Sequence, residues 1–186
     1  MVKPFNIVIV GPPRSGKSTL ANLLSESEAL NASREYRPTC VCRIIDLSDP
    51  EIGMIRLYDT SGDECYMKLI PCICETPDAR IVLWPHDEIE ACSTTRLEPF
   101  SNLASVPADR SALVIFNSSE ESINSPHVQI PESEASVCFG LSITDKDTFR
   151  STIINWIRKL FVYIWRFLFM VRKIFPRITS FFSIFS

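Results

Sequence analysis

Glycine is scarce in this 186-residue chain: there are only five, and three of them (Gly11, Gly16 and Gly62) stand in two short motifs. Histidine is scarcer still, with two residues, so a zinc site with the usual Cys and His spacing is not expected. The seven cysteines are an odd number without a C-x-x-C pair, which does not suit a disulfide framework. No secretory signal stands before the first apolar run, so we expect a reduced, cytoplasmic protein.

The sequence also lacks an uncharged apolar run of membrane-spanning length. The stretch from Leu160 to Val171 is short and contains Arg166, too charged to span a bilayer. Hydrophobic residues make up 46% and charged residues 22%, which is typical of a globular protein and not of a disordered one. Residues 1–149 carry 12 basic and 22 acidic side chains, so a nucleic-acid-binding domain is not expected.

Short apolar runs alternate with helical patterns along the first 160 residues. This alternation is typical of an α/β fold with a parallel sheet between two helical layers. The hairpin at 40–58 would add one antiparallel strand at the edge, so we expect a six-stranded, mostly parallel sheet in a three-layer sandwich. Strands are expected at 5–10, 40–47, 53–58, 79–84, 112–116 and 137–139, and helices after residue 18, over 88–103 and from about 145, with a surface loop over 117–136.

The segment Gly11-Pro-Pro-Arg-Ser-Gly-Lys-Ser18 matches G-x-x-x-x-G-K-[ST] between a predicted strand and a predicted helix, the context that makes such a match specific. Its glycines let backbone N–H groups converge on phosphate oxygens, and the following helix N-terminus favours the same anion. Lys17 is then a point charge for the terminal phosphates, and the Ser18 hydroxyl is a ligand for Mg²⁺. The nucleotide-binding residues expected in this loop are Gly11, Arg14, Ser15, Gly16, Lys17, Ser18 and Thr19.

Two further elements are expected to complete the phosphate site. Asp59-Thr-Ser-Gly62 is a D-x-x-G sequence at the end of an apolar strand, where the carboxylate would approach Mg²⁺ and the Gly62 N–H the γ-phosphate. Thr39 ends the loop before the edge strand, so its hydroxyl is placed to close over the same ion. The expected metal-site residues are therefore Ser18, Thr39 and Asp59.

With these elements in place, the chain resembles the small GTPases of the Ras superfamily, and more closely the Rab-like GTPase subunit of intraflagellar transport complex B. The resemblance covers about residues 5–160 and is carried by residues 11–27, by Glu35-Tyr-Arg-Pro-Thr39, Arg43-Ile-Ile-Asp-Leu and Asp59-Thr-Ser-Gly-Asp63, and by the final helix around Trp156-Ile-Arg-Lys-Leu160. It implies GTP or GDP and Mg²⁺ as ligands, and two switch loops, around Thr39 and after Asp59, that order on the γ-phosphate.

Three departures from the family pattern affect the expected chemistry. Asp63 stands where the family usually has a glutamine that orients the attacking water, so slow hydrolysis is expected, with Lys17 and Asp63 beside the reacting phosphate. Pro13 and Arg14 replace small residues near the place of an incoming arginine finger. Asn117-Ser-Ser-Glu120 stands for the guanine-reading N-K-x-D, with Glu120 as the acceptor, and Gly140-Leu141-Ser142 is expected as a last base-contacting loop.

The sequence after residue 160 is not explained by the resemblance. Residues 150–186 contain seven basic and no acidic residues, and ten of the 19 aromatic residues. We expect a GTPase domain over 1–160 and a tail over 161–186 whose basic face begins at Arg158 and Lys159. Three interpretations stay open for the tail: contact with an anionic membrane surface through residues 158–186, packing against a partner helix, or no regular structure.

Several functions remain in competition. The first is a regulatory or structural GTP-binding subunit of intraflagellar transport, in the cytoplasm and the cilium or flagellum, with coiled-coil subunits of complex B as partners. The alternatives are a Rab-like membrane-trafficking GTPase, with peripheral membrane contact, and a scaffold that does not depend on nucleotide. A P-loop nucleotide kinase is disfavoured, because the three arginines of residues 80–149, Arg80, Arg96 and Arg110, are not clustered as a lid would need.

Overall fold

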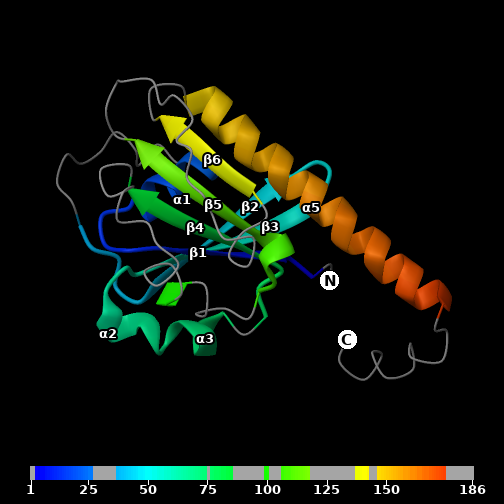
Figure 1. Ribbon diagram of the computed structural model, residues 1–186, viewed down its shortest axis with the longest axis horizontal. Helices are drawn as coiled ribbons and strands as arrows, with labels where there is room; N and C mark the ends of the chain where they lie inside the picture. Colours follow the sequence, from blue (N-terminus) through cyan, green and yellow to red (C-terminus); the bar gives the residue numbers. More distant parts are fainter. Residues whose placement is uncertain are drawn as a thin grey trace.

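A computed structural model describes residues 3–26, 37–74, 76–85, 99–100, 106–117, 137–142 and 146–174. A six-stranded sheet in the order β2-β3-β1-β4-β5-β6 forms its middle layer. Five strands are parallel, and only β2 runs antiparallel to its neighbour β3. This confirms the predicted α/β fold with an antiparallel edge strand (Figure 1). The strands are β1 (Phe5–Val10), β2 (Cys42–Asp49), β3 (Gly53–Thr60), β4 (Ala79–Pro85), β5 (Ser111–Asn117) and β6 (Val137–Ser142).

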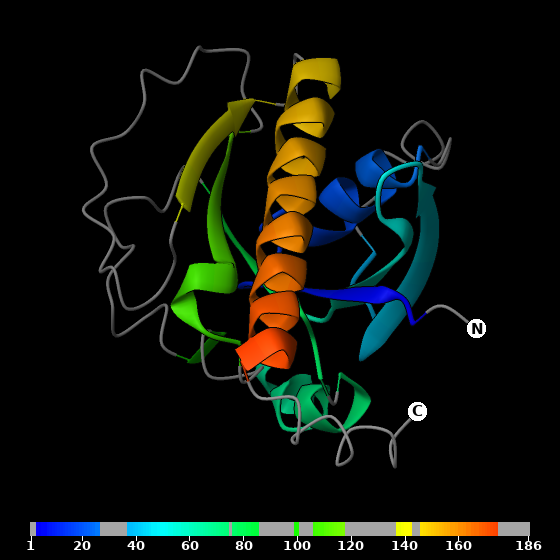
Figure 2. The same ribbon diagram turned by 90° about the vertical axis from the view of Figure 1, so that its right-hand side faces the viewer.

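Helices α1 (Lys17–Leu24) and α5 (Lys146–Ile174) cover one face of the sheet (Figure 2). Alternate residues of β1 face them, because successive side chains of a strand point to opposite faces. The resulting core joins Phe5, Ile7 and Ile9 to apolar side chains of both helices, among them Leu20, Leu24, Phe149, Ile153, Ile157 and Leu160. This layer holds the phosphate loop and the start of α1 on a rigid base.

The opposite face is covered by the short helices α2 (Glu64–Met67) and α3 (Ile70–Ile73) and by Phe100. Val8 and Val10, the residues of β1 that point to this side, pack with Ile70 and Cys74. No element was predicted between residues 63 and 78. Two local signals mark these helices, since Asp63 caps α2 and a proline stands in the first turn of α3.

In the β2–β3 hairpin, β2 lies two residues later than the predicted strand at 40–47, and β3 is two residues longer than the predicted strand at 53–58. The first strand was predicted to end at residue 47, but it continues to Asp49, which pairs with Gly53. Its buried carboxylate accepts hydrogen bonds from the N–H groups of Glu51 (2.9 Å) and Ile52 (3.1 Å), which closes the turn from within the strand. β3 continues to Thr60, so Asp59 lies inside the strand and not after it.

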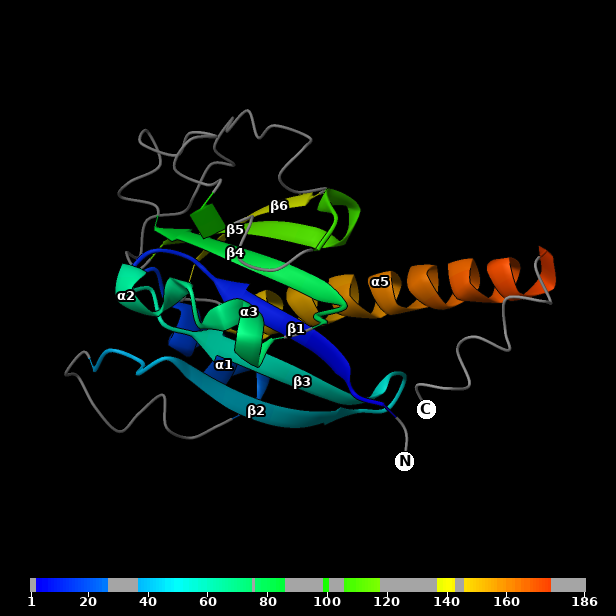
Figure 3. The ribbon, with the colours of Figure 1, turned by 90° about the horizontal axis from the view of Figure 1, so that it is seen from below.

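The last helix runs without interruption from Lys146 to Ile174 and so passes through residue 160. Ile164 still belongs to the core, whereas the following turns project beyond the sheet, away from the carboxyl ends of the parallel strands (Figure 3). Of the helices in the described part of the chain, none combines the length and the apolar character needed to cross a membrane.

Other predictions are met in part or lie outside the described residues. β6 extends to Ser142 instead of ending at residue 139, so the prediction of a base-contacting loop at Gly140–Ser142 is wrong: these residues complete the strand and pair with residues 115–117 of β5. Most of the predicted helix over 88–103, the loop after residue 117 and the expected start of the last helix at about residue 145 lie outside the described residues.

Candidate functional site

The loop between β1 and α1 is shaped by three residues with positive φ. They are Gly11 (φ 149°), Arg14 (φ 60°) and Gly16 (φ 89°). A side chain at Gly11 would overlap the carbonyl oxygen of Leu83 on β4, so glycine is required there by close backbone approach. Gly16 is the N-cap of α1 and contributes no side-chain cap, which leaves the first N–H groups of the helix open to a ligand.

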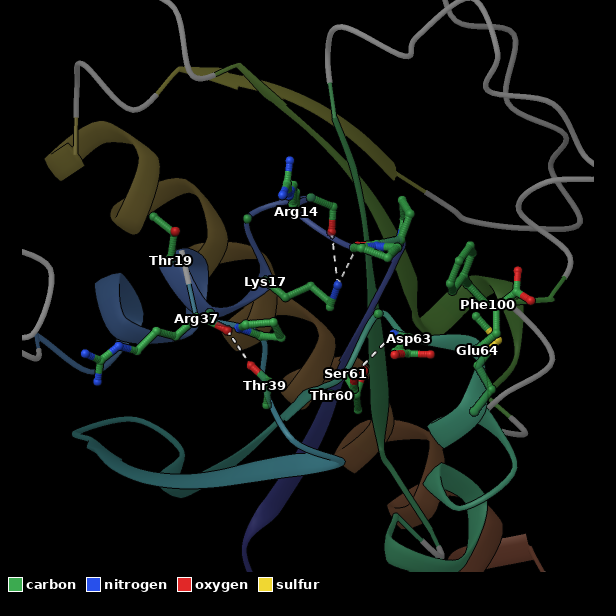
Figure 4. Close-up of a pocket in the computed structure, with 18 of the residues that line it drawn as sticks. Arg14, Lys17, Thr19, Arg37, Thr39, Thr60, Ser61, Asp63, Glu64 and Phe100 are labelled. Atoms are coloured by element: carbon green, nitrogen blue, oxygen red, sulfur yellow. Dashed lines mark hydrogen bonds between the residues drawn. The ribbon is translucent and has the colours of Figure 1, made fainter. Parts of the chain in front are cut away.

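Lys17 folds back over this loop, as Figure 4 shows. Its Nζ donates hydrogen bonds to the carbonyl oxygens of Gly11 (2.9 Å) and Pro12 (2.6 Å) and to Ser15 Oγ (3.3 Å). Only 6% of the residue is exposed. Burial lowers the pKa of Lys17 to about 8, although the nearby Asp59 carboxylate acts in the opposite direction. The ammonium group is thus held where a phosphate would gain a strong, desolvated counter-charge.

Ser18 and Thr39 meet from two separate elements. Ser18 stands in the first turn of α1, and Thr39 lies in the segment that leads to β2. Their hydroxyl oxygens are 2.9 Å apart, in hydrogen-bonding contact. The loop around Thr39 therefore closes onto the start of α1, as the sequence predicted for the residue pair.

Asp59 completes this group from β3 and is 0% exposed. Its Oδ2 accepts a hydrogen bond from Arg43 Nε (3.2 Å) and forms an ion pair with Arg43 Nη2 (3.0 Å). Its Oδ1 is buried and accepts no hydrogen bond from the part of the chain that the structure describes. Burial raises the pKa of the Asp59 carboxyl, while Ser18, Arg43 and Lys17 act against that rise. Such a carboxylate oxygen suits a cation or a water bound to one.

The D-x-x-G loop lies directly against the phosphate loop. A Cβ on Gly62 would come within 2.5 Å of Pro13 N, 2.6 Å of the Pro12 carbonyl carbon and 2.7 Å of Lys17 Nζ, so only glycine fits. Asp63 follows as the N-cap of α2 and accepts a hydrogen bond from the Cys65 N–H (3.0 Å). Hydrogen bonding from Cys65 lowers the pKa of Asp63, which keeps this carboxylate charged at the rim of the site.

These elements enclose a cavity of about 1140 Å³. Every residue predicted for the phosphate loop except Gly11 lines it directly, together with Thr39, Gly62 and Asp63. Gly11 and Asp59 are not part of this lining. The carbonyl oxygen of Gly11 accepts a hydrogen bond from Lys17, which lines the cavity, and Asp59 pairs with Arg43. Sequence analysis missed Asn22, Arg37, Pro38, Glu64, Met67 and Phe100 in the lining. Arg37 and Pro38 stand directly before Thr39 in the sequence, so the Thr39 motif could have indicated them. Phe100 is far from every motif in the sequence, and only the folded structure brings it to the cavity.

The predicted base-reading residues are placed only in part. Asn117 ends β5 at the same edge of the sheet as the phosphate loop, and its backbone pairs with that of Ser142. Glu120 lies outside the described residues. The position of Asn117 agrees with the rule that ligands of parallel sheets bind beyond the carboxyl ends of the strands.

Comparison with known proteins identifies the family of this fold and site. Residues 6–118 match the family described as 50S ribosome-binding GTPase, which is more than half of the chain. The chain belongs to this GTPase family. The match ends just past β5, so it includes the phosphate loop, Thr39 and the D-x-x-G loop.

Curated relatives of the GTPase carry the name intraflagellar transport protein 22. The human homologue is 29% identical over 89 residues, which cover 44% of this chain and 46% of that protein. The protein of Chlamydomonas reinhardtii is 29% identical over 83 residues, covering 42% and 43%. The chain thus spans less than half the length of the curated relatives it matches. The predicted resemblance to a GTPase of intraflagellar transport is confirmed by these relatives.

Two solved structures share the fold at low sequence identity. One is the GTP-bound crystal structure of IFT22/74/81 of Trypanosoma brucei, with a TM-score of 0.59, 18% identity and coverage of 85% of this chain and 97% of that one. The other is the Arl6 BBS3 small GTPase of the same organism with bound GppNp, with a TM-score of 0.61, 11% identity and coverage of 87% and 99%. Both support the small-GTPase fold of this chain.

Proposed function

We propose that this GTPase binds GTP and GDP through the cavity beside the phosphate loop and serves as a regulatory or structural subunit of intraflagellar transport. The observation that carries the proposal is the convergence of Lys17, the Ser18–Thr39 hydroxyl pair and buried Asp59 at one end of the sheet. Proteins named for intraflagellar transport among the relatives supply the cellular context. The cytoplasm and the cilium or flagellum are the locations that follow from it.

Mg²⁺ is the metal that we propose for Ser18, Thr39 and Asp59. Neighbouring ligands of octahedral Mg²⁺ at about 2.0–2.1 Å lie about 3 Å apart, and the two hydroxyl oxygens are separated by 2.9 Å. The unpaired Asp59 Oδ1 adds a carboxylate oxygen of the kind that the ion or its water prefers. When bound, the ion would neutralise charge on the phosphate oxygens.

Guanine selectivity is proposed for Asn117 and Glu120. A carboxylate at position 120 is the chemical type that accepts hydrogen bonds from the guanine N1–H and amino group, while adenine offers no such donor pair. Asn117 stands at the end of β5, which is where we expect the base of a nucleotide whose phosphates bind to the Gly11–Ser18 loop.

Hydrolysis is proposed to be slow, because Asp63 has no amide group to orient a water molecule. Its carboxylate is also engaged, since it accepts the Cys65 N–H at the start of α2. Asp63→Gln supplies the missing amide at the cost of this cap, and a faster single-turnover rate in the variant would support the assignment. An unchanged rate would mean that another group limits the reaction.

The proposed partners are other subunits of intraflagellar transport complex B, with coiled-coil segments as their contact regions. The Trypanosoma brucei relative in the structure named IFT22/74/81 supports this, because it was crystallised together with two other such proteins.

Residues 1–160 are proposed as the GTPase domain and 161–186 as a tail whose helical part contacts an anionic membrane surface. Around Ile164, the side of α5 turned away from the core exposes Val162, Tyr163 and Trp165 beside Lys159 and Arg166. Aromatic and basic side chains together are typical of helices that lie in the membrane interface. Leu160, the last residue of the predicted GTPase domain, is buried in the core.

Nucleotide binding by the full-length protein tests the proposal. We expect binding of GTP and GDP with Mg²⁺, little binding of ATP, and loss of binding in Lys17→Ala. Lys68→Ala is the matched control, because it removes an exposed lysine at the end of α2. Equal binding of ATP would contradict the assignment of Asn117 and Glu120. Absence of all nucleotide binding, in a protein that still assembles with its partners, would point to a scaffold instead.

A further inference from the structure

We propose that Arg43 is a built-in counter-charge for Asp59, which makes nucleotide retention by this GTPase depend only weakly on Mg²⁺. This inference rests on the proposed function, since it concerns the same nucleotide and ion. It assigns Arg43 as a positioning residue, acting on the metal site through the carboxylate that it holds.

Arg43 is placed by the register of the hairpin. It stands on β2 directly opposite Asp59 on β3. Its Nε and Nη2 both contact Asp59 Oδ2, at 3.2 and 3.0 Å, and Nη2 also reaches the Ser18 carbonyl oxygen at 3.4 Å. One guanidinium therefore joins the edge strand, the D-x-x-G strand and the start of α1 at the place proposed for the ion.

The two carboxylate oxygens of Asp59 have different surroundings. Oδ2 is taken by Arg43, while Oδ1 is buried and has no partner among the described residues. An ionised carboxylate that is 0% exposed is strongly destabilised unless a cation compensates it. Arg43, together with the nearby Lys17, provides part of that compensation within the chain itself, so the site depends less on the metal in order to tolerate the charge.

The guanidinium of Arg43 must also reduce the free energy that a bound metal adds to nucleotide binding. With the metal present, the positive charge of Arg43 repels a divalent cation that shares its carboxylate. With the metal absent, Arg43 stabilises the carboxylate and so stabilises the metal-free site. Both effects reduce the free energy that Mg²⁺ adds to nucleotide binding. The side chain of Arg43 is 41% exposed, so solvent screens its charge in part and the effect is moderate.

The hairpin offers a matched control in a second arginine–aspartate pair. Arg56 on β3 stands opposite Asp46 on β2, and its Nε and Nη2 bind the two carboxylate oxygens at 2.7 and 2.8 Å. Neither residue lines the nucleotide cavity. Arg56→Gln therefore removes the same kind of cross-strand pair from the same hairpin without touching the proposed metal site.

The test measures release of fluorescent mant-GDP from the full-length protein as free Mg²⁺ is varied from excess EDTA to millimolar concentration. The readout is the ratio of the release rate in EDTA to that in Mg²⁺. We expect a ratio below about tenfold in the wild type and a ratio about tenfold larger in Arg43→Gln, equivalent to about 1.4 kcal/mol of added coupling. Arg43→Lys, which keeps the charge, should stay near the wild type, as should Arg56→Gln.

The outcomes separate this inference from the function on which it rests. A ratio of a hundredfold or more in the wild type would overturn it without any variant. An unchanged or smaller ratio in Arg43→Gln would also overturn it, and so would Arg43→Lys behaving like Arg43→Gln, because geometry and not charge would then decide. Failure of the wild type to retain nucleotide at any Mg²⁺ concentration would overturn the proposed function as well.

Discussion

Lys17 is buried at an energetic cost in the folded protein, and its ammonium group is also the one proposed to bind the phosphates. Desolvation lowers its pKa to about 8, so in the free protein a poorly hydrated ammonium group is held against carbonyl oxygens. A phosphate would replace part of the lost hydration and stabilise the charged form. Because the charged form is favoured in the complex, binding of the nucleotide must raise the pKa of Lys17.

The sign of the pH dependence follows from this shift. At pH 8 about half of the free protein carries neutral Lys17, since the pKa is about 8. Nucleotide binding at this pH should therefore take up about half a proton, and affinity should fall as the pH rises further. Calorimetric titration with GDP at pH 8, in two buffers of different ionisation enthalpy, measures the uptake. A heat of binding that does not depend on the buffer would refute this account of Lys17.

Residue-level prediction from the sequence succeeded where a motif fixes the backbone. The phosphate loop, Thr39 and Asp59 could be placed together because each lies at or next to the end of a strand at the same edge of the sheet. The Arg43–Asp59 pair could not, since it depends on the register of β2 against β3. A slip of one residue would turn the Arg43 side chain to the other face, and local sequence does not specify this register.

At the scale of elements, Asp49 ties the hairpin to the last helix. Its carboxylate closes the β2–β3 turn and also accepts hydrogen bonds from Arg158 Nε (3.1 Å) and Nη2 (2.9 Å) on α5. Burial alone would raise the pKa of Asp49, but hydrogen bonds from Arg158 and from the Glu51 and Ile52 N–H groups lower it overall. The hairpin that carries Arg43 is thereby anchored to the helical layer.

Asp49→Ala should lower the free energy of unfolding by about 1–2 kcal/mol, because two backbone N–H groups and the Nε and Nη2 of Arg158 lose their acceptor, while Arg158 keeps its ion pair with Glu51. Urea denaturation at pH 7 measures the loss. A group whose pKa is lowered on folding stabilises the protein above its unfolded pKa, so the difference from the wild type should shrink as the pH falls below about 4. Asp46→Ala is the control, since the Asp46–Arg56 pair is exposed and should matter much less. Equal losses in the two variants would refute the anchoring role of Asp49.

Elements differed in how far the sequence revealed them. Four-residue helices such as α2 and α3 are too short to show a helical period, so their only local signals are the capping Asp63 of α2 and the proline in the first turn of α3. The opposite case is α5, where neither glycine nor proline occurs between Lys146 and Ile174. A helix without a breaker continues past the end of the sheet that nucleates it, which explains why it passes through residue 160.

On the scale of the whole molecule, nucleotide and membrane would be engaged at opposite ends. The cavity lies at the carboxyl ends of the parallel strands, whereas α5 projects beyond the other end of the sheet (Figures 1 and 3). Around Ile164, the side of α5 turned away from the core exposes 55% of Trp165 together with Arg166. The two functions can therefore be tested separately, because a change near residue 165 is remote from the phosphate loop.

The full-length protein should sediment with vesicles that contain anionic phosphatidylserine and not with vesicles of neutral phosphatidylcholine alone. Arg166→Glu should weaken this partition about tenfold or more, because each basic residue near an anionic surface contributes about 1 kcal/mol and the substitution reverses one. Trp165→Ser should weaken it by removing an interfacial aromatic side chain. Lys68→Glu is the matched control, since it makes the same charge reversal on an exposed lysine near the other end of the molecule.

The result also decides among the three interpretations of the tail. Partition that disappears at high salt and in Arg166→Glu identifies an electrostatic membrane contact, because screening shortens the reach of these charges to a few ångströms. Binding to neutral vesicles that Lys68→Glu and Arg166→Glu leave unchanged would instead indicate nonspecific adsorption of aromatic side chains. Absence of partition, with GDP binding intact, would overturn the proposed membrane contact without affecting the nucleotide site, and binding of a partner helix would be the next interpretation to test.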